Sequence, residues 1–359
     1  MDRHYYQNLA EDRLCMPIGA DVVLHAEPDP AAVLRDGAAL GRVVEKTARR
    51  FHTPLAMPLM DLQLEKATLL RGLNLPAADV ASFHFDPAPT SEQMATLRRT
   101  ITGPLAPRLQ VQVDAVAYVA RQAPDLLPCG MTIGPFSLMT KLLKDPITPV
   151  YLSGAGMTVA EEPAVAGVER GLELAMLVIE RSLRAQLEAG AKAIFIAEPA
   201  ANKVYLSPKQ IESGSDVFER LVMTNLRRYK AILDEYGADL FFHCCGELTD
   251  QMIASFCTLD PALLSLGSSR PLWEVAPLVP TRTVLFGNLP SKRFYSDSAL
   301  PVSAVEDQAC ELVDRMQAIN RPFILGSECD VLSVCGCEAS ILRKIDAFMS
   351  VGRGREAAA

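Results

Sequence analysis

The sequence predicts an α/β protein of the (β/α)₈ TIM-barrel class with a helical extension at its N-terminus. From about Leu55 onward, short apolar runs of strand length alternate with amphipathic segments of helix length, which is typical of βα units around a parallel sheet. Polar and sulfur-bearing residues follow several of the expected strands, where barrel enzymes carry their active sites. Because no Gly-x-Gly-x-x-Gly turn follows the first strand, a barrel is favoured over an open doubly wound sheet.

The second half of the chain shows the alternation most clearly. A helix is expected over residues 169–188, ending before Gly190, and a buried strand is expected over residues 193–197. The later expected elements are helices at 215–236, 273–278 and 302–319 and strands at 240–242, 263–266, 283–286 and 322–325. We therefore expect a helical cap over residues 1–50, a catalytic TIM-barrel domain over 51–350 and a flexible tail over 351–359.

The composition excludes several classes of protein. Hydrophobic residues make up 49% and charged residues 22% of the 359 residues, which is usual for a globular enzyme with a large core. The net charge of −8 argues against nucleic-acid binding, and no stretch approaches the roughly 18 apolar residues of a membrane span. We expect a cytoplasmic protein, in which nine cysteines indicate thiols or metal ligands more readily than disulfides. A homodimer is compatible with these features.

A histidine and two cysteines stand where one expected strand ends. The segment Phe241-Phe242-His243-Cys244-Cys245-Gly246 runs from an apolar strand into a glycine turn. Because side chains alternate along a strand, His243 and Cys245 lie on one face and can grip one ion, whereas Cys244 points into the packing between sheet and helices. The alternative is that all three are buried core residues, since free cysteine is among the most buried residue types.

A second strand end favours the metal site. The segment Phe323-Ile324-Leu325-Gly326-Ser327-Glu328-Cys329 is again a strand that ends near a cysteine, and parallel barrel strands open on the same mouth. His243, Cys245 and Cys329 would form an N/S₂ ligand set that suits Zn²⁺ and leaves one position open. Cys335 and Cys337 are alternatives to Cys329 or a separate thiol pair, and we rank Cys329 first.

Several ordered segments resemble those of a known family. They are Gly130-Met131-Thr132-Ile133-Gly134-Pro135-Phe136-Ser137-Leu138, Ala189-Gly190-Ala191 with Glu198-Pro199, Leu206-Ser207-Pro208, Gly287-Asn288-Leu289 and Gly326-Ser327-Glu328-Cys329. Between about Leu55 and Phe348 the chain resembles the uroporphyrinogen decarboxylase superfamily. The His-x-Cys-Gly motif and the distal cysteine resemble its zinc methyltransferase branch, typified by methylcobalamin:coenzyme M methyltransferases.

The resemblance implies a function and a set of partners. It implies a zinc-dependent methyltransferase that moves a methyl group between a corrinoid, methylcobalamin bound to a separate carrier protein, and a small-molecule acceptor. The acceptor would be a thiol or another soft nucleophile such as tetrahydrofolate, activated by the metal. To admit a corrinoid, we expect a broad cavity around the three ligands, lined by Phe136, Met139 and Asn288.

Two carboxylates are candidate catalytic residues. Glu198 stands where the superfamily usually has Asp, so it is either a fourth ligand or base near the metal, or a strand-end carboxylate bound to a backbone amide. Asp61 falls near the position of an acidic residue at the barrel mouth in the superfamily, and its alternative is an N-cap for a helix at 62–70.

One departure from the family pattern narrows the substrate class. The decarboxylases carry an N-terminal Arg-Gln-Ala-Gly-Arg segment that grips tetrapyrrole carboxylates, and nothing in this sequence reproduces it. Tetrapyrrole decarboxylation is therefore disfavoured. The competing hypotheses are a metal-independent decarboxylase or lyase of this type acting on another substrate, and a non-catalytic protein that binds a corrinoid or tetrapyrrole.

Overall fold

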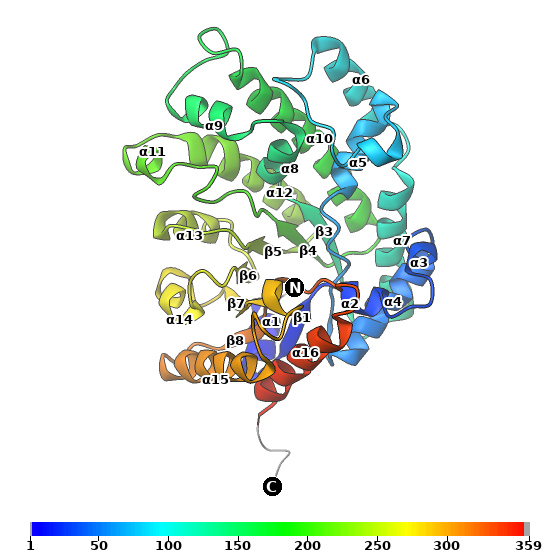
Figure 1. Cartoon of the computed structure of the whole chain (residues 1–359), viewed down its shortest axis with the longest axis vertical. Coiled ribbons are helices and arrows are strands. Elements are labelled where there is room, and N and C mark those ends of the chain that lie inside the picture. The colour runs from blue at the N-terminus through cyan, green and yellow to red at the C-terminus, as the bar shows by residue number, and fades with distance from the viewer. Residues whose placement is uncertain (1, 355–359) are drawn as a thin grey trace.

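The computed structural model of the chain describes residues 2–354. Within them, eight parallel strands form one curled sheet in the order β1-β8-β7-β6-β5-β4-β3-β2, surrounded by helices (Figure 1). The strands are β1 (Cys15–Ile18), β2 (Leu55–Ala56), β3 (Leu127–Ile133), β4 (Ala193–Ala197), β5 (Asp239–Cys244), β6 (Leu263–Leu266), β7 (Val284–Leu289) and β8 (Phe323–Asp330). This confirms the predicted barrel class. Residues 355–359 of the expected tail lie outside the described residues.

The helices follow the strands in βα order. They are α1 (Arg3–Glu11), α2 (Asp21–Leu24), α3 (Pro30–Val33), α4 (Gly37–Arg50), α5 (Leu64–Leu70), α6 (Ser91–Thr102), α7 (Pro107–Gln122), α8 (Pro135–Leu142), α9 (Ile147–Gly154), α10 (Val165–Glu188), α11 (Pro208–Glu212), α12 (Thr224–Glu235), α13 (Asp250–Cys257), α14 (Leu272–Val275), α15 (Val302–Ala318) and α16 (Glu338–Gly352). The expected strands at 193–197 and 263–266 are confirmed with the same bounds. Across residues 2–354, no helix has both the length and the apolar composition needed to cross a membrane.

The segment 1–50, expected to be a helical cap, also contains the first strand of the barrel. Four helices lie in it, but β1 pairs in parallel with β8. Pro17 interrupts this short strand, and the register with β8 shifts between Met16 and Ile18. Because proline has no backbone N–H for the ladder and four residues show no clear alternation, the sequence pattern did not distinguish β1 from its helical surroundings.

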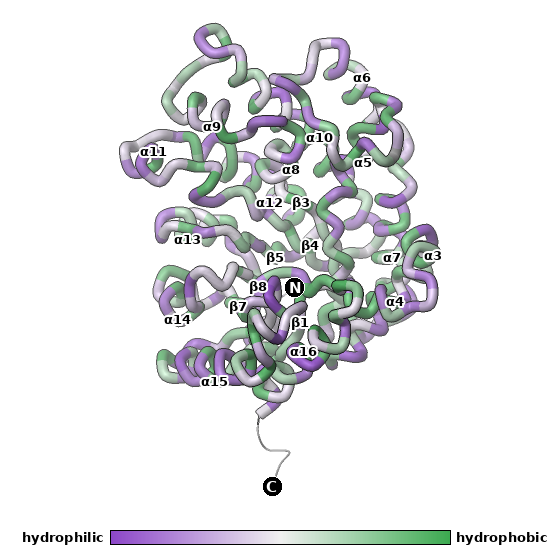
Figure 2. The backbone as a smooth tube through the Cα atoms, viewed as in Figure 1, coloured by the Kyte–Doolittle hydropathy of each residue, from purple (hydrophilic) through white to green (hydrophobic). Residues whose placement is uncertain are grey.

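The core has an inner and an outer layer. Alternate side chains of the strands fill the barrel interior, among them Phe195, Phe241 and Phe286. The side chains between them, such as Phe242 and Leu285, pack outward against the helices. Burying each large apolar side chain contributes about 1.5–3 kcal/mol. Figure 2 shows the matching pattern on α15, which alternates hydrophobic and hydrophilic residues along one outer helix.

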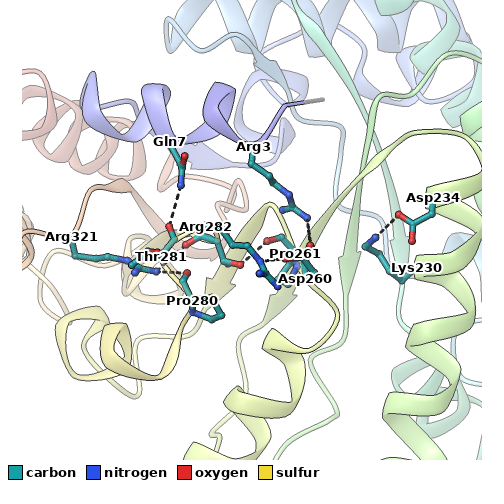
Figure 3. Close-up of polar contacts among 11 residues, drawn as sticks. Arg3, Gln7, Lys230, Asp234, Asp260, Pro261, Pro280, Thr281, Arg282 and Arg321 are labelled. Carbon is teal, nitrogen blue, oxygen red and sulfur yellow. Dashed lines mark hydrogen bonds and ion pairs between the residues drawn. The ribbon is translucent and has the colours of Figure 1, made fainter.

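Helix α1 closes the end of the barrel at which the strands begin. The hydroxyl of Tyr6 donates a 2.8 Å hydrogen bond to Asp239 Oδ2 at the start of β5, and its ring packs edge-on against Phe241. Around this buried contact, Arg3 bonds to Asp260, and Gln7 bonds to the carbonyl of Thr281 (Figure 3). Because this end is closed, the functional residues are expected at the opposite end, where the strands finish.

Two long insertions rise at the end where the strands finish. Between β2 and its return helix α7 lie α5 and α6, and between β3 and its return helix α10 lie α8 and α9. These elements lie together beyond the sheet, in the upper part of Figure 1. They are joined by an isolated parallel bridge between Phe85 and Leu143. The insertions therefore form one wall beside the barrel mouth.

We predict that Tyr6→Phe lowers the free energy of unfolding by about 1–2 kcal/mol, because it removes a buried hydrogen bond to a carboxylate. Urea denaturation measures this change. Tyr5→Phe is the matched control on the same helix, and its effect should stay within about 0.5 kcal/mol. Equal effects of the two substitutions would contradict a stabilising role for the bond between Tyr6 and Asp239.

Candidate metal centre

The end of β5 presents His243 to the barrel interior. Phe241 belongs to the inner core layer, whereas Phe242 and Cys244 belong to the outer layer, as strand alternation requires. His243 is 1% exposed. The Cys244 thiol is buried and lies 3.9 Å from the carbonyl oxygen of Ala201, away from the interior. The predicted division of this segment between its two faces is therefore confirmed.

The His243 ring is held by two neighbouring strands. Its Nδ1 lies 3.0 Å from the hydroxyl of Ser265 on β6, and its ring stacks on Phe195 of β4 with centroids 5.3 Å apart. Its Nε2 is buried and has no hydrogen-bond partner among the described residues. A proton on Nδ1 donated to Ser265 leaves a lone pair on Nε2. An unpartnered buried nitrogen is costly, so this atom is the natural metal donor.

Cys329 reaches the same place through an irregularity in β8. On the β1 side, Met16 pairs with Gly326 and Ile18 pairs with Asp330, so β8 has more residues than β1 over the same span. Such bulges re-aim side chains next to functional sites. The donor atoms of His243, Cys245 and Cys329 all lie within 4.8 Å of one another. The structure thus brings together the three residues that the sequence predicted as ligands.

A hydrogen bond joins the side chains of Cys245 and Cys329 and shifts their pKa values in opposite directions. A hydrogen bond from Cys329 holds the pKa of Cys245 well below its usual range, and His243 and the cation of Lys292 act in the same direction against burial. The same bond raises the pKa of Cys329, with burial adding to it. A divalent cation in place of the proton in this hydrogen bond would let both sulfurs ionise.

Lys292 is a charged neighbour of the cluster that sequence reasoning missed. It lies in the short turn Ser291–Arg293 that follows β7. Burial lowers its pKa, but its electrostatic interactions with Cys245, Glu328 and Cys329 and a hydrogen bond to Cys245 outweigh burial and raise it. The Ser291 hydroxyl donates to the carbonyl of Cys329 at 3.2 Å, which fixes this turn beside β8. No local motif marks Lys292, because only the folded barrel brings β5, β7 and β8 together.

Glu198 makes the contacts of a strand-end carboxylate bound to backbone amides. It follows β4 directly and is fully buried. Its carboxylate accepts hydrogen bonds from the amides of Phe136 and Ser137 in the first turn of α8, at 3.2 and 2.6 Å. A Cβ on Gly134 would lie 2.2 Å from Glu198 Oε2, so any side chain there would displace the carboxylate from its hydrogen bonds to α8. Burial raises the pKa of Glu198 to about 7, against these hydrogen bonds.

Asp61 lies in the loop after β2 and is partly exposed. Its carboxylate forms a 3.1 Å ion pair with Arg108 and accepts a hydrogen bond from the amide of Gln63. Helix α5 begins at Leu64, after Gln63, so Asp61 does not cap it. The N-cap alternative is therefore wrong, since the bond to Gln63 closes a turn outside the helix. A role for Asp61 at the mouth stays a prediction.

The predicted cavity-lining residues divide into two kinds. Phe136 and Met139 have no exposed surface and belong to the outer core layer, so the structure places them in packing. Asn288, at the end of β7, donates to the carbonyls of Gly267 and Arg270 and so fixes the loop after β6. A Cβ on Gly267 would lie 2.5 Å from the Cys245 carbonyl oxygen. Asn288 thus holds the loop that packs against the backbone of Cys245, one of the three predicted ligands.

Cys335 and Cys337 lie in the loop between β8 and α16. Cys335 is exposed and Cys337 is partly buried immediately before the helix. Neither belongs to the donor cluster found among residues 2–354, which contains Cys329. The ranking of Cys329 as the distal ligand agrees with this geometry.

Comparisons with known proteins match most of the chain. The family model described as uroporphyrinogen decarboxylase (URO-D) matches residues 33–339. Among solved structures, the chain is similar to a "methyltransferase from Methanosarcina mazei" with 16% sequence identity and a TM-score of 0.64, covering 96% of this chain and 98% of that chain. A search of curated proteins finds no significant match. At this identity, the structural similarity shows the fold.

We predict that the stability contributed by Glu198 falls as pH rises from 4.5 to about 7. Because burial raises its pKa from 4.5 to about 7, the folded protein binds more protons than the unfolded chain in this window. The penalty at pH 8 is about 3 kcal/mol for this shift. Urea denaturation at pH 4.5 and 8 should show a smaller fall for Glu198→Gln than for the unmodified protein.

The control for this measurement is Glu306→Gln, because Glu306 is exposed on α15. It should keep the pH dependence of the unmodified protein. An unchanged pH dependence in Glu198→Gln would show that the buried carboxylate ionises freely.

Proposed function

The chain belongs to the uroporphyrinogen decarboxylase family, and we propose that within this family it is a zinc-dependent methyltransferase. It would move a methyl group between a corrinoid and a thiol, or another soft acceptor such as tetrahydrofolate. The observation that carries the proposal is the convergence of His243, Cys245 and Cys329 within 4.8 Å at the barrel mouth. The similarity to a methyltransferase structure supports the reaction class.

The donor set fits zinc. One neutral imidazole and two thiolates are ligands that Zn²⁺ prefers, and two thiolate charges balance the ion. A bound cation would give the unpartnered Nε2 of His243 a partner. It would also take the place of the proton in the hydrogen bond between the Cys245 and Cys329 sulfurs. When bound, zinc would supply a position at which an acceptor thiol ionises near neutral pH. Three protein ligands leave that position open.

The chain's own residues hold this site in place. Ser265 and Phe195 orient the imidazole, and Asn288 holds the loop behind Cys245. Lys292 places a positive charge beside Cys245 and Cys329, which offsets the additional negative charge that an acceptor thiolate brings. Glu198 binds the first turn of α8 and so fixes the wall beside the mouth. We therefore propose that Glu198 is a positioning residue rather than a catalytic one.

The proposed methyl donor is a corrinoid on a carrier protein. Large apolar side chains are exposed in segments that follow the C-terminal ends of four strands: Ile147, Tyr151 and Met157 after β3, Val204 after β4, Tyr295 after β7, and Leu332 and Val334 after β8. Exposed apolar groups on one face support the docking of a partner there. A carrier that covers the mouth would bring the cobalt-bound methyl group to the acceptor.

We predict that the purified protein carries about one zinc per chain and that Cys245→Ala and Cys329→Ala each retain less than about a tenth of it. Each substitution removes one of three bonds and one of two balancing charges. Elemental analysis after gel filtration measures the retention. Cys244→Ala is the matched control and should keep its zinc, because that thiol faces the outer layer. Zinc lost from Cys244→Ala and kept by Cys245→Ala would contradict the assignment.

We predict that the zinc-loaded protein demethylates free methylcobalamin in the presence of a small thiol. The methyl group moves to sulfur, the cobalt–carbon electron pair stays on cobalt as cob(I)alamin, and the thiol proton is released. Cobalamin absorbance and thioether formation measure the two halves of the reaction. Removing the metal should abolish the rate, and one equivalent of zinc should restore it. Full activity without metal would instead favour a metal-independent decarboxylase or lyase.

A further inference from the structure

Two buried lysines in this protein differ in how their charges are satisfied. The ammonium of Lys344, on α16, is fully buried and has three acceptors: Asp297 Oδ1 at 2.9 Å, Ser340 Oγ at 3.0 Å and the Phe294 carbonyl at 2.7 Å. Lys66, on α5, is 2% exposed. Its ammonium has one acceptor among the described residues, the Ala81 carbonyl at 2.9 Å. Lys66 therefore has ammonium N–H groups without a protein acceptor, and no carboxylate within residues 2–354 forms an ion pair with it.

A second cation stands next to Lys66. Lys141, in the last turn of α8, is half-buried and makes no hydrogen bond or ion pair with any residue of the described chain 2–354. Burial lowers the pKa of Lys66, and the positive charge of Lys141 lowers it further. His84 is exposed at the same place, where burial and the charge of Lys66 lower its pKa. The positive charges of Lys66 and Lys141 repel each other, so an anion bound between them would stabilise the cluster.

Backbone contacts place these residues where the two mouth insertions meet. The amide of Phe85 donates to the Leu142 carbonyl at 2.8 Å, and the amide of Lys144 donates to the Phe85 carbonyl at 3.0 Å. His84 therefore lies beside the end of α8, and Ala81 links Lys66 to the same loop. Figure 1 shows α5 and α8 close together in the wall above the sheet.

The carboxylates nearest to the cluster are already bound elsewhere. Asp61 forms its 3.1 Å ion pair with Arg108. Glu65, the neighbour of Lys66 in the sequence, accepts hydrogen bonds from Thr132 Oγ1 at 2.8 Å and Ser182 Oγ at 2.9 Å. The charge of Asp61 raises the pKa of Lys141, against burial, but neither carboxylate forms a hydrogen bond or ion pair with Lys66 or Lys141. Both ammonium groups therefore keep N–H donors that an external anion can accept.

We propose that Lys66, Lys141 and His84 form a binding site for an oxyanion group, a carboxylate, sulfonate or phosphate, on a small-molecule substrate of this enzyme. The site lies in the wall beside the barrel mouth, so a bound substrate would be held there by its charged end. Lysines bind oxyanions through charge-assisted hydrogen bonds, and partial burial strengthens these bonds. The role in substrate binding rests on the proposed methyl transfer, whereas the anion site itself does not.

Anion binding is tested on the full chain by thermal unfolding at pH 7 in increasing sodium phosphate or sulfate, against sodium chloride of equal ionic strength. A specific site gives a saturable rise in Tm, whereas general salt effects do not saturate. We expect Lys141→Met to raise the half-saturating concentration about tenfold, as for the loss of one charge-assisted bond. A rise that does not saturate, or one unchanged in Lys141→Met, would overturn the site.

The control for charge is Lys144→Met, three residues further along the chain. Lys144 is exposed and paired with Asp86 at 2.6 Å, so its loss should leave the anion response unchanged. The control for location is Cys245→Ala, which should keep the anion response although its metal is lost. An anion response that disappears with the metal would show that the anion binds at the metal centre instead, and would also overturn the site.

The source of the oxyanion is distinguished with two thiols of similar length. If the acceptor carries it, Lys141→Met raises the KM for 3-mercaptopropionate about tenfold and leaves that for the neutral 3-mercaptopropanol unchanged. If the phosphate of the corrinoid carries it, the KM for methylcobalamin rises instead, equally with both thiols. Anion binding without a change in either KM would overturn the substrate role. Anion binding without any methyl transfer would refute the proposed function and leave the anion site standing.

Discussion

The metal centre depends on one constraint: a parallel barrel brings the ends of its strands to a common mouth. His243 and Cys245 come from the end of β5, and Cys329 comes from the end of β8, which is separated from β5 by β6 and β7. Nε2 of His243 has no hydrogen-bond partner among the described residues, and the sulfurs of Cys245 and Cys329 are hydrogen-bonded to each other. A cation between them would bind all three donors. The surrounding contacts of Ser265 and Asn288 serve to hold this arrangement.

Much of this could be predicted from the sequence because its signals are local. Long amphipathic periods and short apolar runs predicted α10, α15, β4 and β6, and alternation along β5 predicted which of its three polar residues face inward. The prediction that Cys329 reaches the same ion needed only the rule that barrel strands share a mouth. The shift in register of β8 against β1, which brings Cys329 to the site, could not be predicted from the hydrophobic pattern of the sequence.

Other features depended on contacts between residues far apart in the chain. Phe136 and Met139 belong to a motif near the site, but their helix faces the outer core, so proximity in sequence did not mean contact with a cavity. Lys292 and Lys66 stand in segments without a motif, and their importance comes from neighbours on other strands and helices. The strand β1 was hidden by its length and by Pro17, and only pairing with β8 makes it a strand.

The buried polar groups of this protein fall into two kinds, and the difference indicates function. Lys344, Glu198 and Glu65 each have two or more partners from the protein, so their burial links helices and strands and needs no ligand. His243 lacks a partner at one nitrogen, and Lys66 lacks a balancing charge. Leaving a buried polar group unsatisfied lowers stability, and such groups persist where a ligand completes them. His243 and Lys66 are two among several such groups in residues 2–354, which also include the Asp330 carboxylate, and they lie at the barrel mouth and in its wall. There, a metal and the charged end of a substrate would complete them.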